Sequence, residues 1–229
     1  MPTDVVEAIR RGDLSALESL LAEKPEAARD RIDGQRTLLH VATDWPGHFP
    51  SVQQTIQLLA RHGAELNAPF HGPHAETPLH WAASSNDVTA LDTLLDLGAD
   101  IEAPGAVIGG GTPLADAVGF GQWNAARRLV ERGARSNLWQ SAALGLMDRV
   151  RDYFAGFTQP SLHEVTNAFW CACHGGQLEA AQFLLERGAD RNWIGHNGRT
   201  PLDAAIRNGN EEVAQWLRSL EAVPSSQPT

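Results

Sequence analysis

A Gly-Ala pair recurs along this chain at a nearly constant interval, and this periodicity constrains the fold more than any other feature. The pairs that follow an apolar, helix-like stretch lie at residues 63–64, 98–99, 133–134 and 188–189, so the first three are 35 residues apart and the last follows after 55. A fixed period of about 20 to 50 residues is typical of proteins built from stacked supersecondary units. We therefore expect a repeat solenoid, with a degenerate unit in the long gap before residue 188.

A Thr-x-Leu motif marks where several units begin. It occurs at residues 37–39, 77–79, 112–114 and 200–202, with proline in the middle of the last three. Threonine caps a helix through its hydroxyl, and proline fits the first helical position because that N–H has no partner inside the helix. Glycine readily takes the left-handed conformation just past a helix end, so an apolar pair shortly before Gly-Ala indicates the end of a second helix. Each unit is therefore predicted to be a helix–turn–helix.

The segments Thr77-Pro-Leu-His-Trp-Ala-Ala83 and Leu94-Leu-Asp-Leu-Gly-Ala-Asp100 closely resemble the consensus of the ankyrin-repeat family, and the chain is similar to stand-alone bacterial members. The resemblance implies an all-α ankyrin-repeat solenoid with finger loops and about six to seven units, degenerate caps included. We expect one domain over residues 1–221. Its units should lie near 4–35, 36–75, 76–110, 111–135, 136–166, 167–198 and 199–220, before a disordered tail over 222–229.

Three segments depart from the family pattern. The second unit inserts residues 45–50, Trp-Pro-Gly-His-Phe-Pro, between its helices, and the two prolines prevent a simple continuation of the helix. The third unit ends in a glycine-rich stretch over residues 103–111, which should lengthen a finger loop; without a following Lys-Ser/Thr it is not a P-loop. The fifth unit, around residues 138–154, lacks the Thr-Pro-Leu motif.

The resemblance implies that the first helix of each unit lines a concave groove. Positions i, i+3 and i+4 share one helix face, so each unit should contribute three residues to the groove. In chain order these sets are Val41, Asp44 and Trp45; Trp81, Ser84 and Ser85; Asp116, Gly119 and Phe120; Gln140, Ala143 and Leu144; Cys171, His174 and Gly175; and Ala204, Arg207 and Asn208.

Exposed aromatic residues commonly mark binding sites, so Trp45, Trp81 and Phe120 are predicted anchors for a partner protein or peptide. In the alternative, the inserted loop folds over the groove and Trp45 and Trp81 bury each other. Asp44 and Asp116 would give the groove a negative floor suited to a basic partner. The predicted binding residues are therefore Asp44, Trp45, Trp81, Ser84, Ser85, Asp116, Phe120, Cys171 and His174.

A second hypothesis is a small-molecule-binding protein or an enzyme, an acid–base hydrolase or isomerase, with a pocket between loop 45–50 and the groove. Burial would raise the pKa of Asp44 or Asp116 so that it could act as a base, with His48 or His174 as its partner. We favour the interaction module, because repeat scaffolds usually bind and seldom catalyse.

The remaining histidines and cysteines suggest structural roles. The resemblance implies that His40 and His80 hydrogen-bond to neighbouring finger loops. Cys171, Cys173 and His174 are residue types that bind zinc, but adjacent helical residues diverge and a second ligand pair is missing from the sequence. We expect no metal and no cofactor.

The net charge of −10 disfavours nucleic acid and anionic membranes as partners. The nearest basic cluster, Arg127, Arg128, Arg132 and Arg135, is interpreted as solvated helix surface. The chain shows neither a signal-like leader nor an apolar run of about 20 residues, and its two cysteines are poorly placed for a disulfide. We therefore expect a cytoplasmic protein.

Overall fold

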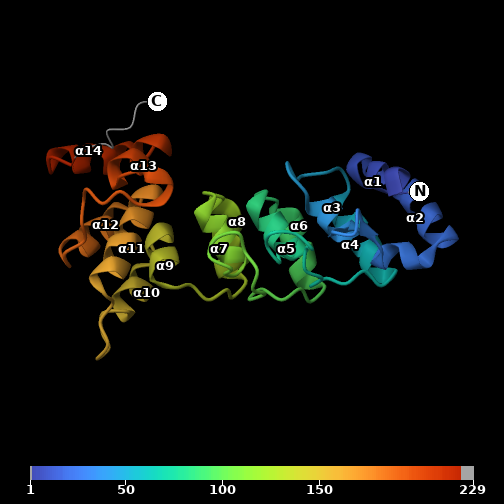
Figure 1. Ribbon diagram of the computed structural model, residues 1–229, viewed down its shortest axis with the longest axis horizontal. Helices are drawn as coiled ribbons and strands as arrows, with labels where there is room; N and C mark the ends of the chain where they lie inside the picture. The colour runs from blue at the N-terminus through green and yellow to red at the C-terminus, as the bar shows by residue number, and fades with distance from the viewer. Residues whose placement is uncertain (1, 223–229) are drawn as a thin grey trace. The chain divides into compact units, whose positions relative to one another are not determined.

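The computed structural model describes residues 2–222, and nearly all of the regular structure in this range is helical (Figure 1). The chain divides into two compact units, whose described parts are residues 2–135 and 136–222. Each unit is a series of antiparallel helix pairs with loops between successive pairs. The predicted all-α repeat fold is confirmed; that all repeats form one domain stays a prediction. Over the described residues, every helix is too short or too polar to cross a membrane.

The first unit contains four helix pairs and a short hairpin. Its helices are α1 (Pro2–Arg11), α2 (Leu14–Glu23), α3 (Leu38–Thr43), α4 (Val52–Arg61), α5 (Pro78–Ser84), α6 (Val88–Asp96), α7 (Pro113–Gly119) and α8 (Trp123–Glu131). A 3-10 helix (Pro25–Arg29) leads into strands β1 (Arg31–Ile32) and β2 (Arg36–Thr37), which pair antiparallel with Arg31 opposite Thr37. The inner helices α3, α5 and α7 pack in succession, and α4, α6 and α8 pack behind them.

The second unit contains three helix pairs. Its helices are α9 (Leu138–Leu144), α10 (Met147–Asp152), α11 (Leu162–His174), α12 (Leu178–Leu185), α13 (Pro201–Arg207) and α14 (Glu211–Ser219), with a 3-10 turn at His196–Gly198. The long helix α11 packs between α9 and α13, and Phe169 is fully buried at the centre of this core. Helix α11 begins inside the predicted fifth unit. The loop that follows α10 extends away from the helices of its unit (Figure 1).

Side-chain caps begin most of the inner helices, whereas the Thr112 side chain makes no cap hydrogen bond at the start of α7. The Thr37 hydroxyl accepts the N–H of His40, and Thr200 caps α13 in the same way through the N–H of Asp203. Asn137 and Ser161 perform this function for α9 and α11, which explains how the second unit starts two helices without the Thr-Pro-Leu motif. Gly63, Gly98, Gly133 and Gly188 follow the ends of the outer helices with φ between 88° and 100°, as predicted.

Each of three repeats is fastened to the finger loop of the next by one buried ring. The Thr37 N–H donates to Nδ1 of His40, so Nε2 carries the proton and donates to the Glu76 carbonyl oxygen at 3.0 Å. His80 reaches the Gly111 carbonyl oxygen at 3.4 Å in the same way, which confirms the predicted role of both histidines. In the second unit the Trp170 indole occupies this position and donates to the Arg199 carbonyl oxygen at 2.9 Å. We call these three contacts the ring clasps.

The sequence suggested that the arginine cluster at the end of α8 is solvated helix surface, but two of its members form ion pairs with the neighbouring repeat. Arg128 donates to both carboxylate oxygens of Asp92 on α6, and Arg132 reaches Asp92 and Asp96 at 2.7 and 2.6 Å. These ion pairs join the outer helices of adjacent repeats, which a pattern read within one helix does not reveal.

The predicted tail begins with Ala222, which is buried and donates its N–H to the Leu217 carbonyl oxygen at 3.2 Å. Residues 223–229, the rest of that predicted tail, lie outside the described residues.

Candidate functional site

The inserted loop over residues 45–50 follows Asp44, the residue just after the end of α3. One carboxylate oxygen of Asp44 lies 3.2 Å from Arg36 and 3.6 Å from Arg10, and the other accepts the Trp45 N–H at 3.0 Å. Its backbone carbonyl accepts the Gly47 N–H at 2.7 Å. The first turn of the loop is therefore fixed by an acid whose charge two arginines already compensate.

The other side of the loop is held by Asp87, a buried residue at the start of α6. One carboxylate oxygen caps α6 by accepting the Ala90 N–H at 3.0 Å, and the other accepts the His48 N–H at 2.6 Å. Gly47 lies so close to the next repeat that an added Cβ would sit 2.8 Å from the Ser85 Cβ, and its φ of 75° also favours glycine. The loop is thus fastened to the turn between α5 and α6.

Trp45 stands out from this fastened loop with 73 % of its surface exposed. Phe120, at the equivalent end of α7, is 45 % exposed. Between them Ser84 is half-buried, whereas Ser85 is buried and donates its hydroxyl to the Thr43 carbonyl oxygen at 3.3 Å. We call this surface, formed by Trp45, Ser84 and Phe120 at the C-terminal ends of α3, α5 and α7, the aromatic edge.

Trp81 is half-buried, but Trp45 does not cover it. Its ring lies edge-on to His40 at 4.9 Å and to Phe70 at 5.3 Å between centroids. Phe70 belongs to the finger loop between α4 and α5, which folds back against the inner helices and donates its N–H to the Glu76 carbonyl oxygen. The hypothesis that Trp45 and Trp81 bury each other is wrong, because Trp45 is largely exposed and the Trp81 ring packs against His40 and Phe70.

Asp116 is fully buried, and its predicted place on an exposed groove floor is wrong. Its two carboxylate oxygens accept the N–H groups of Val107 and Ile108 at 3.3 and 3.0 Å, so the glycine-rich finger closes over it. Burial raises the pKa of Asp116 to about 6. The nearby Glu76, also buried, has a pKa raised to about 7 by burial and then by the charge of Asp116.

The four residues of the predicted acid–base site lie in different surroundings. Asp44 is paired with arginines, Asp116 is enclosed by a finger, and the exposed His48 ring lies 3.9 Å from Asp87. His174 belongs to the second unit, where Nδ1 contacts the Asn208 side-chain amide at 2.9 Å and the ring stacks on Trp170. Glu76 is the acid that lies near Asp116. It was not singled out from the sequence, because the residues around it in the chain do not indicate that it is buried.

The predicted groove face of the second unit is mostly packed. Gln140, Ala143, Leu144 and Ala204 are buried, whereas Arg207 and Asn208 are exposed. Cys171 and Cys173 are buried free thiols, and burial raises the pKa of Cys171 to about 12, so it stays protonated and unreactive near neutral pH. Over the described residues, no three His, Cys, Asp or Glu side chains form a group that could hold a metal.

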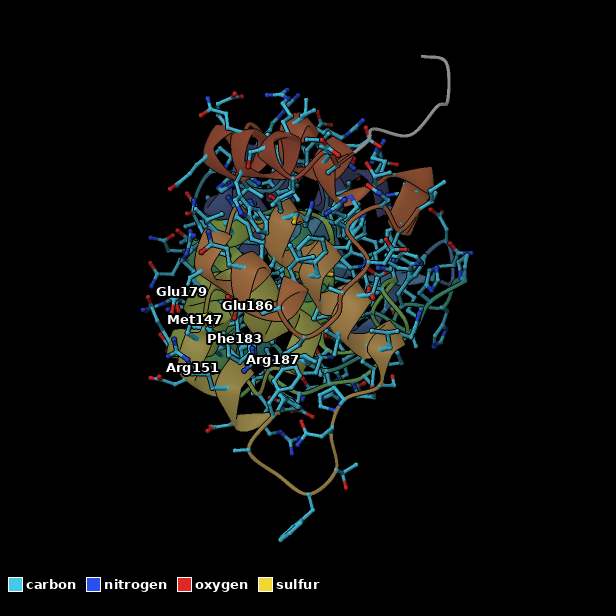
Figure 2. All side chains as sticks on the ribbon, turned by 90° about the vertical axis from the view of Figure 1, so that its left-hand side faces the viewer. Met147, Arg151, Glu179, Phe183, Glu186 and Arg187 are labelled. Atoms are coloured by element: carbon cyan, nitrogen blue, oxygen red, sulfur yellow. The ribbon has the colours of Figure 1, made fainter. Side chains whose placement is uncertain are left out.

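The outer face of the second unit carries a mixed cluster on α10 and α12, made up of Met147, Arg151, Glu179, Phe183, Glu186 and Arg187 (Figure 2). Four of its members interact in pairs. The Arg187 guanidinium lies 3.3 Å from the centre of the Phe183 ring, and Arg151 reaches Glu179 at 2.6 Å. We interpret this cluster as packing between outer helices.

A hollow of about 340 Å³ in the second unit was not predicted from the sequence. It lies where α9, the end of α10, the following loop and the start of α11 meet. Its lining residues are Asn137, Leu138, Trp139, Tyr153, Thr158, Gln159, Pro160, Glu164 and Asn167. The only sequence signal was the irregular segment between α10 and α11, which replaces an ordinary finger loop.

The successive helix pairs, the ring clasps and the finger loops define the class of this protein as a helical repeat solenoid. The family model described as ankyrin repeats (3 copies) matches residues 5–105 and 138–227. The chain belongs to the ankyrin-repeat family, whose repeats are generally protein-interaction modules.

The chain is similar to segments of much larger proteins. It is 28 % identical over 179 residues to SH3 and multiple ankyrin repeat domains protein 2 from Homo sapiens, which covers 72 % of this chain and 9 % of that protein. It is 39 % identical over 61 residues to ankyrin repeat and KH domain-containing protein mask-1 from Caenorhabditis elegans, covering 26 % of this chain and 2 % of the relative. The chain therefore spans less than a tenth of the length of these relatives.

Proposed function

We propose that this chain binds a partner protein through the aromatic edge, with Trp45 and Phe120 as anchors. The observation that carries the proposal is an indole with 73 % of its surface exposed on a loop that is fastened at both ends. The general role of ankyrin repeats in protein interaction supports it. The similarity to multi-domain ankyrin proteins is consistent with this role.

The energetics favour such an anchor. Covering a tryptophan on a partner removes on the order of 100 Å² of apolar surface from water, which is worth roughly 3 kcal/mol. A loop already held by Asp44 and Asp87 loses little conformational freedom on binding, so more of this energy remains as affinity. Tryptophan is also among the residues that most often dominate the energy of interfaces.

The charges at this edge favour an apolar contact over the predicted selection of a basic partner. Asp44 is compensated by Arg10 and Arg36, and Asp116 is enclosed, so neither offers a free negative charge to a ligand. The four residues of the alternative acid–base hypothesis lie in different surroundings, and we do not propose an enzyme. A cytoplasmic location remains our inference from the sequence.

The proposal is tested by capturing partners from a native lysate with the unchanged protein and with Trp45→Ser and Phe120→Ser, and then measuring affinities for purified partners by calorimetry. We expect each substitution to weaken the same partner by tenfold or more. Phe157→Ser, which removes an exposed ring from the second unit, is the matched control and should leave that affinity unchanged. The proposal fails if both edge variants bind every partner as tightly as the unchanged protein.

A further inference from the structure

The hollow of the second unit is a built feature, because hydrogen bonds fix two parts of its wall. The Tyr153 hydroxyl donates to the Ser136 carbonyl oxygen at 3.1 Å, which holds the end of α10 against the start of α9. The Gln159 side-chain amide donates to the carbonyl oxygens of Phe154 and Gly156 at 3.2 and 2.7 Å, which folds the loop back on itself. The volume of about 340 Å³ lies at the lower end of the range of roughly 300 to 1,000 Å³ for ligand pockets. A hollow of this volume can hold one side chain.

The lining combines two aromatic residues with side-chain oxygens and one ionised group. Trp139 and Tyr153 supply rings, and Asn137 and Gln159 carry amide oxygens, of which that of Asn137 also accepts the Gln140 N–H at 3.1 Å. Among the lining residues Glu164 alone is ionised near neutral pH, and it is exposed. Arg149 is not among the lining residues and donates to the Ser136 hydroxyl at 2.9 Å, and His163 precedes Glu164 in the chain and also acts on its charge. An acceptor-rich hollow with a carboxylate and aromatic rings is complementary to a flat organic cation.

Glu164 is held in place and kept ionised by the cap of α11. One of its carboxylate oxygens accepts both the N–H and the hydroxyl of Ser161, at 2.8 and 2.7 Å. These hydrogen bonds keep the pKa of Glu164 below its usual value, so its charge is present over the physiological range. The carboxylate is therefore a fixed negative charge at the rim of the hollow.

We propose that this hollow binds the guanidinium group of an arginine, which pairs with Glu164 and stacks on Trp139 and Tyr153. A guanidinium is planar and has five N–H donors, so it can stack on a ring while it donates to a carboxylate and to amide oxygens. A lysine ammonium is more strongly hydrated and lacks the planar face. This site is separate from the aromatic edge, and binding here does not depend on Trp45.

The test is an NMR titration of the whole chain at low salt with N-acetyl-arginine amide, following the indole N–H signal of Trp139. We expect saturable binding with roughly millimolar affinity, as suits one side chain. N-acetyl-citrulline amide has the same shape without the charge and should bind at least tenfold more weakly. A peptide with one arginine among alanines distinguishes the source of the group: tighter binding of the peptide points to a protein ligand, tighter binding of the amide to a small molecule, and both support the site.

Substitutions make the test decisive. Glu164→Gln keeps a side chain that can cap α11 but removes the charge, and it should weaken binding of the arginine probe about tenfold. Glu186→Gln, an exposed glutamate outside the hollow, is the matched control and should change nothing. At the exposed Thr158, Thr158→Glu should tighten binding and Thr158→Lys should abolish it. Equal binding of both probes, no saturation, or an unchanged affinity in Glu164→Gln would overturn the proposal, whereas a Trp45→Ser protein should bind the probe normally.

Discussion

Burial makes ionisation of Glu76 and Asp116 unfavourable and so raises the pKa of both acids. The finger that covers Asp116 supplies two backbone N–H groups to its carboxylate, yet its pKa still rises to about 6. Glu76 has the Trp81 indole as a hydrogen-bond partner, and its pKa nevertheless rises to about 7. In both cases loss of hydration outweighs the hydrogen bonds that favour the ionised form.

These shifts predict that stability falls as pH rises. A carboxyl group whose pKa is raised by folding binds its proton more tightly in the folded chain, so stability is lost between the ordinary value of 4.5 and the folded value of about 7 for Glu76. Glu76→Gln removes the ionisation and can keep the contact with Trp81. We expect it to raise the free energy of unfolding by about 2 kcal/mol near pH 8 and to change it little near pH 4.

Urea unfolding followed by circular dichroism at the two pH values measures this difference directly. Glu18→Gln, which alters an exposed acid on α2, serves as the control and should have a small effect at both. An equal gain from Glu76→Gln at both pH values would show that its ionisation does not carry the cost.

The inserted loop shows how one side chain can serve two elements. Asp87 caps α6 with one oxygen and holds the backbone of His48 with the other, so the exposed position of Trp45 depends on a residue of the next repeat. Asp13 caps α2 through the Ala16 N–H at 2.9 Å. Comparing substitutions of Asp13 and Asp87 therefore separates the stability lost with a helix cap from the stability lost with a loop anchor.

We expect Asp13→Ala to cost about 1 kcal/mol, the usual value for a lost N-cap, and Asp87→Ala to cost at least 1 kcal/mol more because a further N–H loses its acceptor. Hydrogen exchange should show faster exchange at His48 only in Asp87→Ala. Equal costs and unchanged exchange at His48 would mean that the loop is held without Asp87.

For the whole molecule, the division into two compact units predicts more than one unfolding step. Repeat proteins are stabilised mainly by contacts between neighbouring repeats. A defect in the core of one compact unit should therefore unfold that unit before the other. Phe169→Ala empties the core of the second unit and should cost about 3 to 5 kcal/mol there. Hydrogen exchange with mass spectrometry should then show lost protection over residues 136–222 and retained protection over residues 2–135.

Leu91→Ala is the matched defect in the core of the first unit and should give the opposite pattern. If both variants lower protection equally over the whole described chain, the two units unfold as one cooperative domain.

The repeat fold was predictable from the sequence because its determinants are local. Thr77 caps α5 and Gly98 ends α6 through contacts within a few residues, so short motifs report them. The site was less predictable because its determinants are distant in the chain. Helical spacing indicated the face of Asp116 but not the finger that covers it, and the exposure of Trp45 is decided by Asp87 in the next repeat. The hollow at Trp139 depends on the path of an irregular loop, which no period describes.

The ring clasps have a consequence for synthesis on the ribosome. His40 reaches a carbonyl 36 residues further along, His80 one that lies 31 residues on, and Trp170 one that lies 29 residues on. Each buried ring therefore waits for its acceptor until the next repeat has emerged. Folding during translation should advance one repeat behind the growing end, because the ring of the last repeat to emerge stays hydrogen-bonded to water until the next finger loop supplies its acceptor.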